Sequence, residues 1–387
     1  MTTIGQQVQL EVYGSAIAGK RIDLPFSFDD WEARAREKLT DEAYWYVAGA
    51  AGGGNTMRAN REAFDRARIV QRTLRDVSVR DISVEIFGKR IAAPFLLAPI
   101  GVQGILHPEG ERVPARAAAA AGIPIILSSV SSASMEEVAK EMGPATRWFQ
   151  LYPSRVKELS ASFVSRAEAA GYSAIVVTVD TPALGWRPQD LRLGYLPFLK
   201  ADGVANYFSD PVFRSMCTKP PEQDPGAGVR QFLDVFTHPA FNWTDVAWLR
   251  SVTKLPILIK GIIHPDDASK AADHGVDGVV VSNHGGRQAD GAVGTLDALP
   301  AVVKAVNDRI TVLLDSGVRH GADVLKALAL GAKAVLLGRP YAYALASHGE
   351  EGVTHLLRTF MADIDLQLGL CGQTSAEALD PSFLEGW

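Results

Sequence analysis

Residues 282–288, Ser-Asn-His-Gly-Gly-Arg-Gln, hold the side chains that are best suited to chemistry. His284 can accept a proton near neutral pH. Arg287, three residues later, can hold a carboxylate through two parallel hydrogen bonds. The two glycines between them let the backbone approach another backbone or a ligand closely. A base beside a carboxylate-binding group indicates that the substrate is a small acid.

This segment follows the apolar run 278–281, which is typical of a buried strand. Similar short apolar runs occur at 94–100, 124–127, 146–151, 174–179, 256–259, 311–314 and 334–337. Helical patterns lie between them, for example at 109–121, 156–170, 268–274 and 322–330, and several of them end in glycine. Strand–helix pairs in this series predict an α/β protein with a (β/α)8 TIM barrel. A doubly wound sheet is the alternative, but it usually has fewer strands, and no G-x-G-x-x-G follows the first run.

The chain divides into an extension and a barrel. Residues 1–90 form an N-terminal extension with predicted helices at 27–39 and 56–68, and a glycine-rich turn lies between them. Residues 91–387 form the barrel. One connection, 181–242, is far longer than the few residues usual between elements and includes an irregular stretch at 220–228. We expect 181–242 to be an active-site lid that is partly mobile.

Small or polar residues follow every predicted strand, where barrels of this type build their active sites. In chain order they are Gly101; Ser128 and Ser129; Gln150 and Tyr152; Thr178 and Asp180; Lys260; Ser282, His284 and Arg287; Asp315 and Gly317; and Gly338 and Arg339. A single residue of this kind means little, but such residues at all of the strand ends are hard to explain by structure alone.

The residues after the last two strands, 315–319 together with Gly338 and Arg339, are typical of a phosphate-binding site. Arg339 can pair with a phosphate, whereas Asp315 is suited to accept hydrogen bonds from sugar or ribityl hydroxyls. Lys260 can place a positive charge beside a cofactor that gains electron density. These features suit flavin mononucleotide (FMN) better than pyridoxal phosphate, although a lysine at this position also fits a Schiff base.

Composition excludes several classes of protein. The net charge is −5 and there is no basic block, which argues against a nucleic-acid partner. The chain has 2 cysteines, too few for a disulfide framework, so a reducing, cytoplasmic location is expected. The first thirty residues show no signal-peptide pattern, and no apolar run approaches the roughly 18 residues of a membrane span. The histidines show no metal-ligand spacing, so no metal site is expected.

Residues 282–288 match the active-site signature of the FMN-dependent L-2-hydroxy acid oxidases and dehydrogenases, and the chain resembles that family over nearly its whole length. Further matching segments are Tyr46 before the glycine turn, 98–101, 149–152, 178–181, 260–261, 315–317 and 338–340. The N-terminal extension, the segment 185–190 and the long insertion are most similar to the lactate 2-monooxygenase branch. The chain departs from many relatives at three places: Gly53 and Gly54 replace an acidic residue of the turn, Val130 stands where several have tryptophan, and Gly101 where many have alanine.

The resemblance implies roles for individual residues. His284 would be the general base, taking either the α-proton or the hydroxyl proton, and Asp180 would stabilise its imidazolium. Lys260 would stabilise negative charge on the flavin. Contacts to the substrate are implied for Tyr46, Tyr152, Arg187, His284 and Arg287, and catalytic roles for His284, Asp180, Tyr152, Lys260 and Arg287. Contacts to FMN are implied for Ala98, Pro99, Ile100, Gly101, Ser128, Gln150, Thr178, Lys260, Ser282, Asp315, Gly317, Arg319, Gly338 and Arg339.

Three functions remain open at this point. The first is oxidation of L-lactate by O2 to acetate, CO2 and water. The second is an oxidase that releases a 2-oxo acid and hydrogen peroxide, from L-lactate or from another L-2-hydroxy acid. The third is a barrel that binds a phosphate compound without redox chemistry. The resemblance also implies a homo-oligomer, commonly a tetramer or an octamer.

Overall fold

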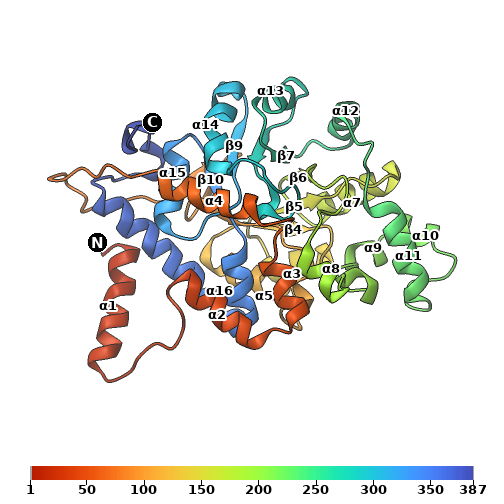
Figure 1. The fold of residues 1–387 in the computed structure, drawn as a ribbon, viewed down its shortest axis with the longest axis horizontal. Helices are drawn as coiled ribbons and strands as arrows, with labels where there is room; N and C mark the ends of the chain where they lie inside the picture. Colours follow the sequence, from red (N-terminus) through yellow and green to blue (C-terminus); the bar gives the residue numbers. More distant parts are fainter. Residues whose placement is uncertain (1, 387) are drawn as a thin grey trace.

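A closed barrel of eight parallel strands forms the centre of the molecule (Figure 1), which confirms the predicted fold class. The computed structural model describes residues 2–386. The strands are β3 (Phe95–Leu97), β4 (Ile125–Ser128), β5 (Arg147–Leu151), β6 (Ile175–Thr178), β7 (Ile257–Ile262), β8 (Gly278–Val281), β9 (Thr311–Leu314) and β10 (Ala334–Leu337). Strand β10 pairs with β3 and closes the barrel. Each strand lies within or overlaps the apolar run that predicted it.

The strand sequences are mostly apolar because both faces of each strand are covered by other residues. In β3, β4, β5, β6, β8 and β10 every residue is buried. One face of each strand packs inside the barrel and the other packs against the outer helices. These helices are α5 (Arg112–Ala121), α6 (Met135–Met142), α7 (Lys157–Ala169), α12 (Trp243–Val252), α13 (Pro265–Asp273), α14 (Thr295–Val306), α15 (Gly321–Ala329) and α16 (Arg339–Leu370).

The N-terminal extension lies partly outside this layer and partly at the carboxyl ends of the strands (Figure 1). It contains α1 (Ile4–Ile17), α2 (Phe28–Lys38), α3 (Asp41–Ala48), α4 (Asn55–Arg66) and a hairpin of β1 (Val84–Ile86) and β2 (Lys89–Ile91). Helices α1 and α2 both contact α16. The Ser27 side chain caps α2, so this helix begins where the sequence predicted. Helices α1 and α3 were not predicted, and Tyr46 lies on α3.

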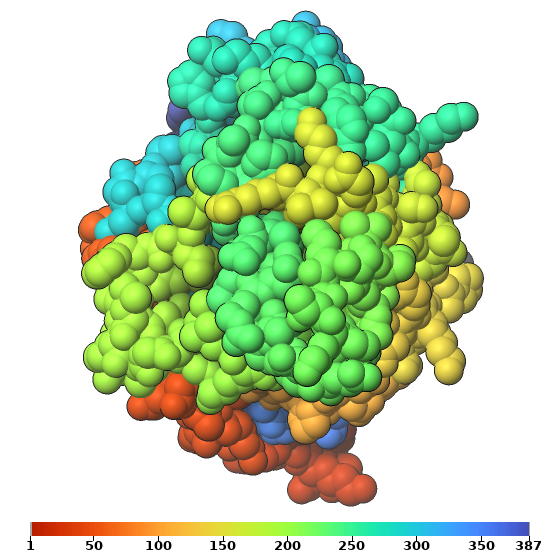
Figure 2. Space-filling model, turned by 90° about the vertical axis from the view of Figure 1, so that its right-hand side faces the viewer, coloured from red at the N-terminus to blue at the C-terminus, as the bar shows by residue number. Residues whose placement is uncertain are grey.

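The insertion at 181–242 is largely helical. It contains α8 (Pro188–Leu193), η2 (Pro197–Lys200), α9 (Ala205–Phe208), α10 (Pro211–Met216) and α11 (Pro225–Phe236). The prediction of an irregular stretch at 220–228 was therefore wrong in part, because α11 begins within it after the Asp224 cap. Figure 2 shows this yellow-green to green segment across the centre of one face of the molecule. Its mobility stays a prediction.

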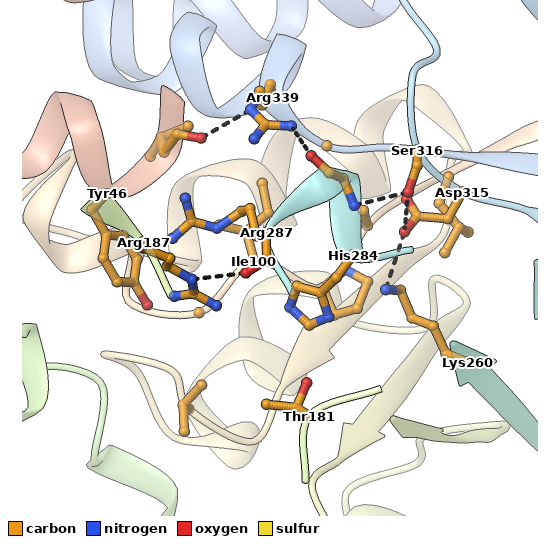
Figure 3. A pocket seen from close by; sticks show the side chains of 18 of the residues that line it. Tyr46, Ile100, Thr181, Arg187, Lys260, His284, Arg287, Asp315, Ser316 and Arg339 are labelled. Carbon is orange, nitrogen blue, oxygen red and sulfur yellow. Dashed lines mark hydrogen bonds and ion pairs between the residues drawn. The ribbon is translucent and has the colours of Figure 1, made fainter. Parts of the chain in front are cut away.

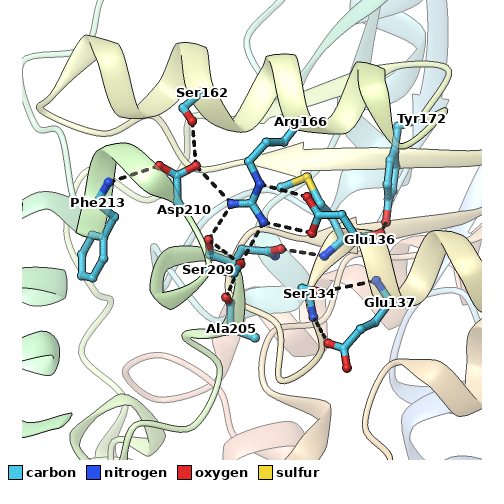
Figure 4. Close-up of polar contacts among 12 residues, drawn as sticks. Ser134, Glu136, Glu137, Ser162, Arg166, Tyr172, Ala205, Ser209, Asp210 and Phe213 are labelled. Atoms are coloured by element: carbon cyan, nitrogen blue, oxygen red, sulfur yellow. Dashed lines mark hydrogen bonds and ion pairs between the residues drawn. The ribbon is translucent and has the colours of Figure 1, made fainter. Parts of the chain in front are cut away.

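An ion-pair network around the buried Asp210 side chain fixes the outer part of the insertion to the barrel helices (Figure 4). Arg166 of α7 contacts Glu136 of α6 at 2.9 Å and Asp210 of the insertion at 3.1 Å. The Asp210 side chain is fully buried and also caps α10. Asn206 donates to Ser131 beyond β4 at 2.8 Å. Because one guanidinium joins three elements, this part of the insertion is held against α6 and α7.

Four short 3-10 helices complete the fold, η1 (Gln103–Ile105), η3 (His284–Gly286), η4 (Ala376–Ala378) and η5 (Pro381–Phe383). Within residues 2–386, no helix is both long enough and apolar enough to cross a membrane.

Candidate active site

A pocket lies at the carboxyl ends of the barrel strands, and most of the predicted site residues line it (Figure 3). The predicted residues on its wall are Tyr46, Ala98, Pro99, Ile100, Gly101, Tyr152, Arg187, Lys260, His284, Arg287, Asp315, Gly317, Arg319, Gly338 and Arg339. The other predicted residues are Ser128, Gln150, Thr178, Asp180 and Ser282, at or just after the ends of β4, β5, β6 and β8. The structure therefore brings together side chains from all eight strand ends and from α3.

A histidine on the pocket wall, His284, is paired with Asp180. The Nδ1 of His284 lies 2.8 Å from Oδ1 of Asp180, and the Thr181 hydroxyl donates to the same oxygen at 3.0 Å. Burial lowers the pKa of His284 below its ordinary value, although the Asp180 carboxylate acts in the opposite direction. Burial opposes the charge of Asp180, but His284 and the ammonium group of Lys260 together lower its pKa. At neutral pH the pair is therefore a neutral imidazole beside a carboxylate, which suits a general base.

The turn that carries His284 needs its glycines. His284, Gly285 and Gly286 have φ angles of 59°, 64° and 76°, so three successive residues adopt the left-handed region. A Cβ atom on Gly286 would lie 2.6 Å from the backbone nitrogen of Met57 on α4. The close backbone approach that the sequence predicted is confirmed, and it turns the imidazole from the end of β8 into the pocket.

Two arginines lie on one side of the His284 imidazole (Figure 3). Arg187 donates to the Gln288 side chain at 2.9 Å and to the Arg287 carbonyl at 3.1 Å. Arg287 donates to the Gly49 carbonyl at 3.0 Å, and its guanidinium lies 5.3 Å from the centre of the Tyr46 ring. Burial, with the like charge of Arg187, lowers the pKa of Arg287 to about 9. The two guanidiniums form a carboxylate-binding site beside the base.

A lysine and an aspartate occupy the opposite side. The Nζ of Lys260 lies 3.1 Å from Oδ2 of Asp315 and donates to the Ser282 hydroxyl at 3.0 Å. Ser282 in turn donates to Asp315 at 2.6 Å. Burial disfavours the ammonium group, but the carboxylates of Asp315 and Asp180 outweigh burial and raise the pKa of Lys260. A fixed positive charge therefore lies at the end of β7.

Three buried polar atoms near these residues have no hydrogen-bond partner among residues 2–386. They are Nε2 of Gln150, Oγ1 of Thr178 and Oδ2 of Asp180. The Oε1 of Gln150 accepts from Ser128 at 2.9 Å, which fixes the direction of the amide. Unpartnered buried polar groups are rare in folded proteins. Here they lie at or just after the ends of the neighbouring strands β5 and β6. A polar ligand in the barrel mouth could form their missing hydrogen bonds.

The end of the pocket beyond β9 and β10 is rich in positive charge. Arg339 begins α16, directly after Gly338, and donates to the carbonyls of Val47, Gly49 and Gly285. The guanidinium of Arg319 lies 4.0 Å from the centre of the Phe28 ring on α2. Burial, with the charge of Arg339, lowers the pKa of Arg319 to about 9. Two guanidiniums at a helix N-terminus suit a phosphate group.

Tyr152 and residues of the insertion form the wall on the solvent side. The Tyr152 ring packs edge-on against Phe236 of α11, with ring centres 5.2 Å apart, and burial raises the pKa of its hydroxyl. Tyr152 is therefore a hydrogen-bond donor at neutral pH. Phe198 of η2 also lines the pocket. The sequence analysis missed both phenylalanines, because nothing in the insertion showed which of its aromatic residues faces inward.

Gly101 and Val130 lie against each other on the wall of the pocket. A Cβ atom on Gly101 would lie 2.7 Å from Cγ2 of Val130 and 3.1 Å from its carbonyl oxygen. The valine thus occupies the space that an alanine at position 101 would need. This contact joins the departures at positions 101 and 130.

Two further polar residues, Gln288 and Asp190, lie against the arginines. Gln288 accepts from Arg187 through its side-chain oxygen, and its amide nitrogen donates to the carbonyls of Asp180 and Ala183, each at 2.9 Å. Gln288 is the last residue of the signature segment 282–288, and this position could have identified it as a site residue. Asp190 lies beside both guanidiniums, at 3.9 Å from Arg187 and 3.8 Å from Arg287. Only the folded structure shows that second contact.

Comparisons with a family model, with curated relatives and with solved structures agree with one another. A family model described as FMN-dependent dehydrogenase matches residues 35–386. An L-lactate oxidase of Lysinibacillus sphaericus is 46% identical over 355 residues, which cover 92% of this chain and 91% of that protein. An FMN-dependent alpha-hydroxy acid dehydrogenase of Schizosaccharomyces pombe is 42% identical, covering 96% of this chain and 93% of that protein. A crystal structure of mandelate oxidase superposes with a TM-score of 0.82 at 40% identity, covering 92% of this chain and 96% of that one.

Proposed function

Since this chain belongs to the FMN-dependent dehydrogenase family, we propose that it oxidises L-lactate with O2 to acetate, CO2 and water. The coarser activity, FMN-dependent oxidation of a 2-hydroxy acid, follows from the family and from relatives that include 2-hydroxy acid oxidases. These relatives are oxidases or dehydrogenases by name, which argues against a barrel without redox chemistry. The choice of lactate and the fate of its product are the new elements of the proposal.

The residues of the pocket fit FMN. The unpartnered Nε2 of Gln150 and Oγ1 of Thr178, together with Lys260, offer donors and a positive charge to a polar ring system at the barrel mouth. Arg319 and Arg339 lie at the phosphate end. When bound, FMN accepts two electrons from the substrate and passes them to O2. The protein supplies the orientation of the substrate and the transfer of its proton.

The observation that carries the proposal is the His284–Asp180 pair facing two buried arginines in one pocket. Because Nδ1 of His284 is bound to Asp180, the other ring nitrogen is left to take a proton. Arg187 and Arg287 would hold the carboxylate of a 2-hydroxy acid beside it. The same geometry accommodates removal of the α-proton or of the hydroxyl proton. In either case Asp180 stabilises the imidazolium that results.

The insertion supports retention of the product. Phe198 and Phe236 bring two rings from η2 and α11 to the pocket wall, and Figure 2 shows the insertion across this face. Pyruvate that stays bound until O2 is reduced meets hydrogen peroxide, and the two react to give acetate, CO2 and water. A lid that slows product release would therefore decide the outcome. Early release would instead give free pyruvate and peroxide, and the 46% identity to an L-lactate oxidase favours that second candidate.

A product assay separates the two candidates. The purified, FMN-loaded protein is given L-lactate under air, and acetate, pyruvate and hydrogen peroxide are measured in the same sample. Acetate with little peroxide is the expected result. Equal amounts of pyruvate and peroxide would establish the oxidase instead. If L-lactate fails to bleach the flavin even without O2, the substrate is a different 2-hydroxy acid.

We further propose a homo-oligomer of four or eight chains in the cytoplasm. The support is the family resemblance for the assembly and the two free cysteines, Cys217 and Cys371, for a reducing location. Light scattering coupled to size-exclusion chromatography measures the mass directly. A monomer at micromolar concentration would contradict the first part.

A further inference from the structure

Asp190 lies between the two arginines of the carboxylate-binding site. Its Oδ2 is 3.9 Å from Nη1 of Arg187 and 3.8 Å from Nη2 of Arg287. All three side chains are nearly buried, with 11 to 12% of their surface exposed. The short helix α8, which begins at Pro188, carries Asp190 in its first turn. The distances are too long for hydrogen bonds, so Asp190 acts on both guanidiniums through its charge.

The guanidiniums keep other partners for their hydrogen bonds. Arg187 donates to Gln288 and to the backbone of Arg287, and Arg287 donates to Gly49. Asp190 is therefore not needed to orient either arginine by direct hydrogen bonding. Its effect is on the charge of the group: two positive charges and one resident negative charge leave a single positive charge. One incoming carboxylate balances that charge.

A second carboxylate on the substrate would find the other cations of the described pocket wall already engaged. Lys260 is paired with Asp315 at 3.1 Å, and Arg339, which donates to the same Gly49 carbonyl as Arg287, would hold the FMN phosphate. Asp180, which binds His284, adds another buried negative charge to the same region. Burial strengthens repulsion between like charges because there is little water to screen them. A dicarboxylate would therefore place its second charge against Asp190 and Asp180.

We propose that Asp190 is a specificity-determining residue that restricts the substrate to 2-hydroxy acids with a single carboxylate and excludes 2-hydroxy dicarboxylates. This inference rests on the proposed function, since it assumes that the substrate carboxylate binds Arg187 and Arg287. Asp190 would select substrates by their charge, which the two arginines alone would not do. Without Asp190 they would favour a dianion.

Binding of inert anions to the FMN-loaded enzyme tests the inference without turnover. Propionate and malonate are similar in size and differ by one carboxylate, and each is titrated at pH 8 while the flavin absorbance is followed. In Asp190→Asn the ratio of the malonate to the propionate dissociation constant should fall by roughly 10-fold or more. Asp190→Glu keeps the charge and should keep the ratio of the unchanged enzyme. The kcat/KM values for L-lactate and L-malate should change in the same direction.

The results that would overturn the inference are distinct. An unchanged ratio in Asp190→Asn, or an equal change in Asp190→Glu, would show that the charge of Asp190 does not select the substrate. The unchanged enzyme gives a second measurement that requires no variant to fold: lowering the pH to protonate one malonate carboxylate should improve malonate binding relative to propionate. A constant ratio would exclude a penalty for the second charge. If neither anion binds the unchanged enzyme, the proposed function fails as well.

Discussion

Replacement of Asp180 by asparagine tests the chemistry of the pocket most directly. The substitution keeps the size of the side chain and removes its negative charge, which lies 2.8 Å from Nδ1 of His284. In the free enzyme the imidazole is neutral, so little is lost before reaction. When His284 takes the proton, a positive charge develops on a buried ring. Asp180→Asn removes the carboxylate that stabilises this charge, so the loss is confined to the reacting state.

The size of the loss can be worked from the distance. The imidazolium charge is spread over both ring nitrogens, so its mean separation from the carboxylate is about 4 Å. At the effective dielectric constant of about 20 that suits protein sites, two unit charges at that separation interact by about 4 kcal/mol. Each 1.36 kcal/mol corresponds to about one factor of ten in rate. We therefore expect substrate-dependent flavin reduction in Asp180→Asn to slow by about 10³-fold.

The assay is anaerobic stopped-flow mixing with L-lactate, which reports flavin reduction before O2 takes part. Thr181→Val is the matched control, because Thr181 donates to the same oxygen of Asp180 at 3.0 Å and carries no charge. Loss of this hydrogen bond to a charged oxygen costs about 1.5 to 3 kcal/mol, but the bond is present both before and during reaction. Most of that loss therefore does not reach the rate, and this variant should slow by no more than about 10-fold. Equal effects in the two variants, with full FMN content in both, would refute the electrostatic role of Asp180.

Four further outcomes follow from the geometry. His284→Gln should keep FMN but reduce it at least about 10²-fold more slowly, measured in the same stopped-flow assay; normal turnover would disprove its role as base. As the solution becomes acidic, kcat/KM should fall, since His284 gains a proton before reaction and can no longer act as base; because burial lowers the pKa of His284, a fall that begins above neutral pH would contradict this. Gly101→Ala should lower the free energy of unfolding by about 1 to 3 kcal/mol, and Val130→Ala in the same chain should restore part of it, because the added Cβ would lie 2.7 Å from Val130. Phe198→Ala should shift the products of L-lactate from acetate toward pyruvate and peroxide, whereas an unchanged ratio would remove this residue from the lid.

The barrel and its rim could be predicted because local patterns determine them. A strand covered on both faces must be apolar along its length, as Gly278–Val281 is, and the same residues form β8 in the structure. Residues that follow such strands must meet at one end of a closed parallel barrel. His284, Lys260 and Asp315 were therefore placed correctly on the pocket wall without knowledge of any distance.

Contacts between distant segments could not be predicted in this way. The sequence shows Asp190 near Arg187, but only the fold brings Arg287 beside the same carboxylate. The stacking of Phe28 on Arg319 likewise joins the N-terminal extension to the far end of the barrel. Helices α9 and α10 were missed because each is at most six residues long and depends on tertiary contacts rather than on its own propensity.

The way in which the insertion is attached indicates where the pocket can open. Its first residues are tied to the signature segment, since Gln288 binds the backbone of Ala183 and Gly185. Its later residues are tied to α7 through Arg166 and Asp210 (Figure 4). Opening at either anchor would break buried polar contacts or displace the arginine that holds the substrate. The segment between the anchors includes η2, whose Phe198 faces the pocket while Leu199 beside it is 57% exposed. Movement of η2 would leave Arg187 in place, so we expect the time for which a product is held to be set there rather than at the flavin.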